Sequence, residues 1–475
     1  MDPKKFQAVV VSPRSYFVFT PLLASTSVGT LEFRTAIEPI RSRRTQVNFF
    51  QGWADDVDFG NKTIIIEEAV DDPHQGLAPT GDRHEGMTVE DREKYRIAEE
   101  KKGKLFDMTY DKLIITVGCY SQTFGTPGVR EHAHFLKDVG DARKIRNRLL
   151  TCFETAALPT TSDEMRKHLL NFAVIGGGPT GIEFSAELND IINEDMAKIY
   201  PDLIKFHKIT VYDVAKSVLS MFDKNLGRYA MDTFRREGIA IKTEHHIESL
   251  RPGLPKDSTE KLPEGEIKDP HACYTLKIKE EGEIGVGMVV WSTGLMMNPF
   301  VKRVLSNVRE IPTDSVFYEK DNSRLEDPRK MRWLVKKHPR SGAVLTNDQL
   351  RVLLETEAGQ DKGTKLRTVM RDVYALGDCA NMEDTMYPAT AQVASQKATW
   401  LAKRLNKGDL DSNHFTYRDL GVMAYLGNWN AVLQSSGGNF SGRAAWLIWR
   451  GAYLTKSVSW RNKILIPCYW LVKQC

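Results

Sequence analysis

The sequence predicts an α/β protein with two Rossmann-like domains and a separate C-terminal segment. Three observations support this fold class. Short apolar runs end repeatedly in glycine, as parallel strands do where the chain turns back. A glycine-rich turn at residues 176–181 lies between such a run and a helix-forming stretch. Residues 420–475 differ from the rest in composition, because they contain basic residues and tryptophans but no acid.

Bulk composition limits the functional classes. The chain has 475 residues, enough for two or three domains. Of these residues, 41% are hydrophobic and 27% are charged. A net charge of +4 over this length argues against a nucleic-acid partner held by phosphate contacts. The six cysteines are scattered, so neither a metal site nor a disulfide framework is expected. No apolar run reaches the roughly eighteen residues of a transmembrane helix, and residues 1–13 resemble neither a signal nor a transit peptide.

Two parts of the chain that are separated in the sequence are expected to form one domain, with a second domain inserted between them. Residues 6–11 and 113–117 each indicate a buried strand, and so does the run that ends at Gly377. Residues 71–104 are dense in charged residues and are interpreted as a solvated insertion. The expected boundaries are 1–135 and 341–420 for the two parts of the first domain, 165–300 for the second domain, 301–340 for a charged insertion and 421–475 for the C-terminal region.

The strongest local signal is the segment FAVIGGGPTGIEFSAE at residues 172–187. An apolar strand precedes Gly176-x-Gly178-x-x-Gly181 and a helix-forming stretch follows, which is the context of a dinucleotide site. The first glycine permits the tight turn, the second lets the backbone approach a pyrophosphate, and the third lets helix and strand pack closely. The next strand ends in Asp213, an acid suited to bind a ribose 2′-hydroxyl. We therefore predict an NAD(H) or NADP(H) site; the alternative is an ordinary glycine-rich turn.

The spacing within this motif is unusual. Asp213 follows Gly176 by 37 positions, whereas about 20 are usual. The intervening helical stretch, residues 182–206, is therefore expected to be longer than normal. Helical spacing also marks residues 137–170 and 385–405.

With these features in place, the chain resembles the pyridine nucleotide-disulphide oxidoreductases, and a narrower group within them. The blocks SPRSYFVFTPLLASTSVGTLEFRTAIEPI, AVIGGGPTGIEFSAEL, YALGDCA with PATAQVASQKATWLAK, and DLGVMAYLG are similar, in this order, to the type II, non-proton-pumping NADH:ubiquinone oxidoreductases. The resemblance implies non-covalent FAD that takes a hydride from NADH and passes two electrons to ubiquinone. It also implies a peripheral protein of the mitochondrial inner membrane, and it leaves a homodimer open.

The resemblance assigns residues to FAD block by block. Asp378, in the late Gly-Asp pair, matches the acid beside the ribityl chain and pyrophosphate. The strand end after residue 115 matches the segment that flanks the FAD adenosine. The residues that match FAD-binding positions are Ser12, Arg14, Thr20, Pro21, Thr116, Gly118, Asp378 and Ala391.

The resemblance also assigns the substrate sites. Glu183 matches an acid near the nicotinamide, and Tyr453 matches a tyrosine that lines the quinone tunnel. Gln392 and Gln396 form an AQxxxQ signature where flavin and quinone meet. The residues that match NADH-binding positions are Gly176, Gly178, Gly181, Asp213 and Gly294, the last in Ser292-Thr293-Gly294 where the family has an ATG-like turn.

Each of these side chains has a structural alternative. Glu183 would also suit the positive N-terminal end of a helix without any catalytic role. Gln392 and Gln396 lie four residues apart and could share a surface face of a helix. Asp213 could cap a turn, and Tyr453 could be an interfacial anchor.

The C-terminal region carries a separate signal. Aromatic and basic residues without acids are typical of amphipathic segments that lie on an anionic membrane surface. The alternative is a C-terminal helix that packs on the protein's own core or on a second copy. The region contains Arg443, Arg450, Lys456, Arg461, Lys463 and Lys473, and the tryptophans Trp429, Trp446, Trp449, Trp460 and Trp470.

One departure from the family pattern leaves other functions open. The family begins with its own GxGxxG for the FAD pyrophosphate, upstream of the strand at residues 6–11, and this chain starts after it. Either the sequence is truncated, which we favour, or its FAD site is impaired. The alternatives to the leading function are a soluble NAD(P)H oxidase or ferredoxin-type reductase, and a truncated, non-catalytic remnant. A disulphide reductase is not expected, because the first cysteine is Cys119.

Overall fold

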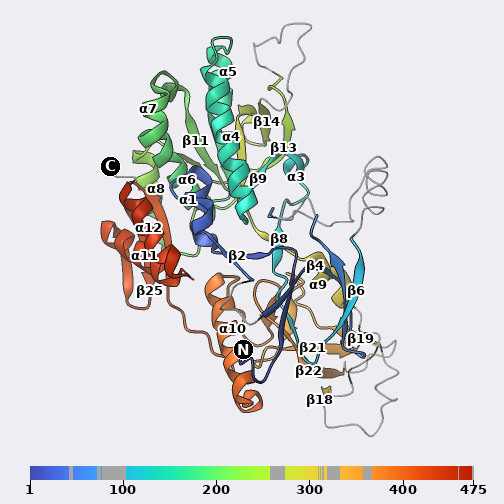
Figure 1. Ribbon diagram of the computed structural model, residues 1–475. Coiled ribbons are helices and arrows are strands. Elements are labelled where there is room, and N and C mark those ends of the chain that lie inside the picture. Colours follow the sequence, from blue (N-terminus) through green and yellow to red (C-terminus); the bar gives the residue numbers. More distant parts are fainter. Residues whose placement is uncertain are drawn as a thin grey trace.

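The computed structural model describes residues 1–41, 47–71, 76–77, 103–256, 273–306, 308, 310, 312, 315–317, 332–356, 366–457 and 459–472. These residues form a mixed α/β fold, as predicted, in which the C-terminal elements lie beside α6 and α8 (Figure 1). Much of the charged stretches 71–104 and 301–340 lies outside the described residues. The prediction that these stretches are solvated insertions therefore stays a prediction.

The dinucleotide lobe is a five-stranded parallel sheet with the helices that pack on it. Its central strand, β10 (Asn171–Ile175), is apolar and buried after its first residue, as expected for a strand covered on both faces. Helix α4 (Val139–Ala157) begins at Asp138, whose side chain forms a capping box with Asp141. The strand order is β12 (Ala240–Lys242), β11 (Lys208–Tyr212), β10, β16 (Met288–Trp291) and β9 (His134–Phe135).

A long helical run follows the glycine turn, as the spacing predicted. Helix α6 (Pro179–Ile191) starts with a proline, which suits a first helical turn. It continues through a π-helical turn (Ile192–Met196), α7 (Ala197–Ile199) and a 3₁₀ turn (Pro201–Phe206) before β11 begins. These extra turns account for the distance between Gly176 and Asp213.

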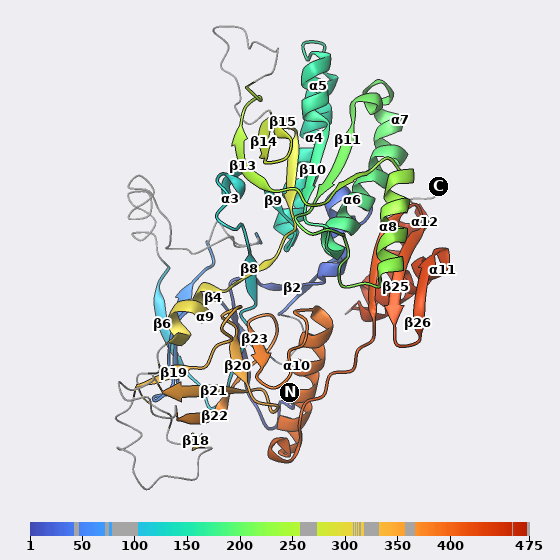
Figure 2. The ribbon, with the colours of Figure 1, turned by 180° about the vertical axis from the view of Figure 1, so that it is seen from behind.

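A second lobe, here called the two-part lobe, combines strands that come before the dinucleotide lobe in the sequence with strands that come after it. Strand β7 (Leu113–Ile115) pairs in parallel with β22 (Arg367–Ala375), so Leu113 lies beside Val373, far away in the sequence. A further sheet has the order β1 (Ala8–Ser12), β4 (Val47–Asp58), β5 (Thr63–Glu68) and β6 (Leu105–Thr109). Helix α10 (Ala391–Lys407) lies beside the strands of this lobe (Figure 2) and packs Leu401 and Leu405 with Met382.

Most of the C-terminal region belongs to the core of the dinucleotide lobe, whereas its last helix packs in a separate cluster with Leu22, Leu31 and Ala142. Strands β24 (Val422–Gly427), β25 (Asn430–Ser435) and β26 (Gly438–Gly442) form an antiparallel meander, followed by α11 (Arg443–Lys456) and α12 (Trp460–Val472). Ala424, Leu426 and Trp446 share one buried cluster with Ile182 and Ala186 of α6. Among the described helices, none is both long and apolar enough to cross a membrane.

Candidate functional site

The glycine turn has the geometry of a dinucleotide site. Gly176 has φ of +111°, and a side chain at this position would place its Cβ 2.8 Å from the carbonyl oxygen of Ser292. At Gly181 the Cβ would lie 2.0 Å from the carbonyl oxygen of Gly176. At Gly178, the N-cap of α6, no atom lies within 4 Å of an added Cβ. The first and third glycines are therefore required by packing, while the second leaves the helix N-terminus open to an anionic group.

Asp213 and Gly294 lie at the same edge of the sheet. Asp213 follows β11, and its carboxylate accepts hydrogen bonds from Gly177 N at 2.5 Å and Ala215 N at 2.7 Å. The Asp213 side chain therefore stabilises the turn, as the alternative role of a turn cap predicted. It also lies at the edge of the sheet, where the predicted role in ribose binding would place it. Gly294 follows β16 and is exposed, and its carbonyl oxygen accepts from Gln122 N at 3.0 Å. Because ligands of parallel sheets bind at the carboxyl ends of the strands, these residues form one candidate surface.

The FAD candidates of the two-part lobe gather where β7 and β22 end. Gly118 and Gly377 have φ of +66° and +83°, and no atom lies within 4 Å of a Cβ added to either. Thr116 is exposed and Asp378 is half-buried. Two adjacent parallel strands thus end in open glycine turns, and an acid directly follows the second glycine, which fits a nucleotide cofactor such as FAD.

A side-chain network ties the other FAD candidates to the start of α4. Lys137 donates a hydrogen bond to the carbonyl oxygen of Cys119, whose thiol donates to the carbonyl oxygen of Asp378 at 3.1 Å. Burial lowers the pKa of Lys137, although the nearby Asp378 carboxylate acts in the opposite direction. The adjacent Asp138 forms an ion pair with Arg14. The remaining candidates are Ser12 at the end of β1, Thr20 (exposed) and Pro21 in a 3₁₀ turn (Thr20–Leu22), and Ala391 at the start of α10.

Glu183 and Tyr453, two of the catalytic candidates, are brought together by Trp449. Oε1 of Glu183 accepts hydrogen bonds from Trp449 Nε1 and from Tyr425 N, each at 3.2 Å. The ring of Tyr453 meets that of Trp449 edge to face at 4.9 Å between centroids and contacts Phe19 at 6.1 Å. Burial raises the pKa of Glu183 to about 8, outweighing the two hydrogen bonds that lower it. Burial therefore favours the protonated form of this carboxyl.

Two further acids on α6 were missed by sequence reasoning. Glu187 accepts hydrogen bonds from Ser25 Oγ at 2.6 Å and Thr30 Oγ1 at 2.9 Å. Asp190 accepts from the Tyr425 hydroxyl at 2.6 Å. A signal was present, because Glu183, Glu187 and Asp190 recur at helical spacing among apolar residues and so share one face. That face joins the dinucleotide helix to α1 (Leu23–Val28) and to the C-terminal meander.

Gln392 and Gln396 share one side of α10, as their spacing predicted, and both hold the same segment. This segment, residues 417–421, is called the connector because it leads from the two-part lobe into β24. Gln392 donates to Gly421 O at 3.2 Å and accepts from Leu420 N at 3.0 Å. Gln396 exchanges two hydrogen bonds with the backbone of Arg418, at 2.8 and 3.0 Å. Their amides are thus occupied by the chain itself.

The tryptophans of the C-terminal region divide into two groups. Trp446, Trp449 and Trp470 are buried, as the alternative interpretation of a self-packing helix expected. The Arg450 guanidinium lies 4.1 Å from the ring centroid of Trp446 and 4.4 Å from that of Trp470, so it joins α11 to α12 by cation–π contacts. Trp429 and Trp460 are exposed, by 40% and 72%. Of the five tryptophans that were predicted to belong to a membrane-surface segment, only Trp429 and Trp460 are therefore exposed.

Comparisons with known proteins agree with this geometry. Residues 5–315 match the family described as pyridine nucleotide-disulphide oxidoreductase, and residues 420–474 match the NDH2 C-terminal domain. A "Probable NADH dehydrogenase" from Dictyostelium discoideum is 33% identical over 474 residues, covering 98% of this chain and 84% of the relative. The "External alternative NAD(P)H-ubiquinone oxidoreductase B1, mitochondrial" from Solanum tuberosum is 31% identical over 540 residues, covering 99% and 85%. The structure of NDH2 from Plasmodium falciparum in complex with NADH has a TM-score of 0.72 at 21% identity, covering 100% of this chain and 94% of that one.

The fold and the glycine turn thus define a dinucleotide-dependent flavoprotein oxidoreductase. The chain belongs to the pyridine nucleotide-disulphide oxidoreductase family and, within it, to the type II NADH dehydrogenases. Its cofactors are FAD and NADH, as the sequence predicted.

Proposed function

We propose that this chain oxidises NADH through FAD and reduces ubiquinone by two electrons, without pumping protons, as a peripheral protein of the mitochondrial inner membrane. The observation that carries the proposal is the buried joint of Glu183, Trp449 and Tyr425, which fixes an NDH2-type C-terminal domain to the helix of the glycine turn. The names of the curated relatives support the substrates and the location.

The described residues divide the work between two nucleotide sites. Gly176, Gly178 and Gly181 would bind the NADH pyrophosphate, with Asp213 at the ribose and Gly294 beside the nicotinamide half. The glycine turns at residues 116–118 and 377–378, together with Ser12, Arg14, Thr20, Pro21 and Ala391, would bind FAD. When bound, FAD supplies the hydride acceptor and the two-electron donor. The protein contributes binding and orientation, so no nucleophilic side chain is required.

Glu183 and Tyr453 are proposed to serve the quinone. The resemblance placed Glu183 near the nicotinamide, but its carboxyl is held by Trp449 and Tyr425 of the C-terminal region, so we assign it to the quinone instead. A quinone that accepts two electrons also takes up protons, and Glu183 holds one because burial raises its pKa to about 8. The ring of Tyr453 contacts Trp449, which is hydrogen-bonded to Glu183. On its other side it contacts Phe19, which directly precedes the Thr20–Leu22 turn. This position would connect a quinone near the flavin with a protonated carboxyl. Gln392 and Gln396 would act on the same site by fixing the connector.

The C-terminal helices are proposed to lie on the membrane. Leu447 and Ile448 of α11 are 64% and 44% exposed, and Trp460 and Ile464 of α12 are 72% and 63% exposed. Arg443 and Lys456, at the two ends of α11, are also exposed. Apolar side chains with flanking cations suit an interface that carries anionic lipid. A homodimer stays a separate prediction, which the mass of the purified protein in detergent would test.

The function can be tested on the purified chain. A flavin absorption spectrum, bleached by NADH and restored by a soluble ubiquinone, is the expected result. Bleaching that only oxygen or ferredoxin reverses would favour the soluble reductase, and NADH binding without a flavin spectrum would favour the remnant. In sealed vesicles, NADH oxidation by quinone should proceed without acidification of the lumen. Either acidification or failure of ubiquinone to reoxidise the flavin would contradict the proposal.

A further inference from the structure

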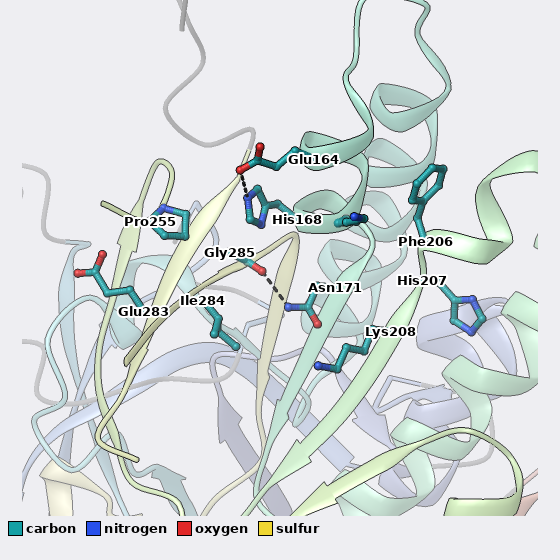
Figure 3. Close-up of a pocket in the computed structure, with 11 residues that line it drawn as sticks. Glu164, His168, Asn171, Phe206, His207, Lys208, Pro255, Glu283, Ile284 and Gly285 are labelled. Carbon is teal, nitrogen blue, oxygen red and sulfur yellow. Dashed lines mark hydrogen bonds and ion pairs between the residues drawn. The ribbon is translucent and has the colours of Figure 1, made fainter. Parts of the chain in front are cut away.

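The dinucleotide lobe has a cavity at the end of the sheet opposite to the glycine turn. Its volume is about 580 Å³, within the roughly 300–1,000 Å³ of small-molecule sites. It lies between α5 (Asp163–Leu169), the first residues of β10 and β11, and β15 (Gly282–Val286) (Figure 3). Asn171 and Ile175 mark the two ends of β10, so the cavity and the dinucleotide turn are separated by the full length of this strand.

The cavity is lined by two lysines and two glutamates, which differ in their partners. Lys167 and Lys208 line it and are exposed, and neither forms an ion pair with any residue that the structure describes. The carboxylate of Glu283, by contrast, is already held by Arg251 at 2.8 Å and by Lys256 N at 3.1 Å. Glu283 is thus paired with Arg251 and Glu164 lies 3.9 Å from Nε2 of His168, whereas the two lysines have no ion-pair partner among the described residues.

Two fixed polar side chains stand beside these lysines. The ring of His168 rests against Gly285, where an added Cβ would lie 2.2 Å from its Nδ1. Its buried Nε2 has no hydrogen-bond partner among the described atoms, since the nearest carboxylate oxygen, of Glu164, is 3.9 Å away. Asn171 uses its Nδ2 to donate to Gly285 O at 2.8 Å, and both side chains border the cavity in Figure 3. Nε2 of His168 is thus enclosed by the protein and lies nearer to Glu164 than to the open part of the cavity, so we assign it no ligand.

We propose that this cavity binds a small organic anion. Its carboxylate or phosphate group is held between Lys167 and Lys208. The apolar part of the ligand packs between Phe206 and Ile284, which line opposite walls. The site is independent of NADH oxidation, because none of these side chains belongs to the dinucleotide turn.

Calorimetric titration of the full chain with citrate and, separately, with inorganic pyrophosphate tests the site. NAD⁺ is kept saturating so that the glycine turn is filled. We expect one-to-one binding of at least one probe: citrate alone indicates a carboxylate ligand, and pyrophosphate indicates a phosphate ligand. The double variant Lys167→Glu and Lys208→Glu should bind about tenfold more weakly or worse. Lys198→Glu, which reverses an exposed charge away from the cavity, should bind like the wild type.

A chemical measurement keeps the test independent of how the variants fold. In the wild-type protein, the bound probe should slow acetylation of Lys208 and leave acetylation of Lys198 unchanged. The proposal is overturned if neither probe binds, if the double variant binds as tightly as the wild type, or if Lys208 reacts equally fast with and without the probe.

Discussion

Trp449 donates a hydrogen bond from its indole Nε1 to Oε1 of Glu183 over 3.2 Å. These residues are 266 positions apart, and their contact fastens the C-terminal helix α11 to α6, the helix that follows the glycine turn. Tyr425 N donates to the same oxygen, so one carboxyl group holds two elements of the C-terminal domain. A change in the charge of Glu183 should therefore alter the contact between α6 and the C-terminal domain.

Stability should depend on pH through Glu183. The folded protein keeps this proton up to about pH 8, whereas an unconstrained carboxyl loses it near 4.5. Because the folded state binds more protons in this window, the stabilising contribution is complete below the lower value and is lost as pH rises through the upper one. Glu183→Gln removes this dependence. Thermal unfolding from about pH 5 to 9 should show the variant gaining on the wild type as pH rises.

The control for this measurement is Glu131→Gln, which alters an exposed carboxylate on another helix. It should keep the wild-type slope. Equal slopes for wild type and Glu183→Gln would show that Glu183 does not retain its proton in the folded protein.

Substitutions at Gly178 and Gly181 should separate an effect on NADH affinity from an effect on folding stability. Gly178→Ala meets no atom within 4 Å and should keep the wild-type melting temperature. Its methyl group would occupy the approach of the pyrophosphate, so NADH should bind at least about tenfold more weakly. Gly181→Ala places a Cβ 2.0 Å from the Gly176 oxygen and should also lose about 1–3 kcal/mol of stability. Fluorescence titration and thermal unfolding measure the two effects, and a strongly destabilised Gly178→Ala would contradict the assignment.

Asp213 should set the preference between NADH and NADPH. Its charge repels a 2′-phosphate, while its oxygens also hold Gly177 N and Ala215 N. Asp213→Asn keeps one carbonyl acceptor and removes the charge. We expect the ratio of kcat/KM for NADH over NADPH to fall by about tenfold, which corresponds to ~1.4 kcal/mol of relieved repulsion. An unchanged ratio would mean that Asp213 serves only the turn.

Local sequence patterns predicted the parts of this site that depend on local geometry. The glycines at 176, 178 and 181 act within one turn, and the pairing of Gln392 with Gln396 follows from helical spacing. The partners of these residues could not be predicted in the same way. Glu183 meets Trp449, and the glutamines meet the connector, only because distant segments fold together. Composition likewise identified the unusual C-terminal region, but packing decided which tryptophans face inward.

The exposed apolar side chains of α11 and α12 should control membrane binding. Leu447→Glu with Ile464→Glu replaces two side chains that are 64% and 63% exposed, so the fold should be retained. Binding to vesicles that contain anionic phospholipid should fall, because apolar insertion is lost and like charge is introduced. Ile199→Glu, at a residue 61% exposed on α7, is the matched control. Flotation of both variants with the vesicles to the same extent would count against this surface.

Gln392 should affect the quinone half-reaction more than the NADH half-reaction. Its amide holds Gly421 O and Leu420 N and accepts from the Tyr417 hydroxyl, so it fixes the connector that leads to β24 and Glu183. Gln392→Phe removes all three hydrogen bonds, and a displacement of about 1 Å is enough to disturb a reacting geometry. Gln392→Glu keeps the acceptor oxygen and should be intermediate. In stopped-flow absorbance of the FAD-loaded chain, NADH should still reduce the flavin of Gln392→Phe at the wild-type rate while ubiquinone reoxidises it more slowly. A variant that lost reduction by NADH but kept reoxidation by ubiquinone would show that this helix serves the other substrate.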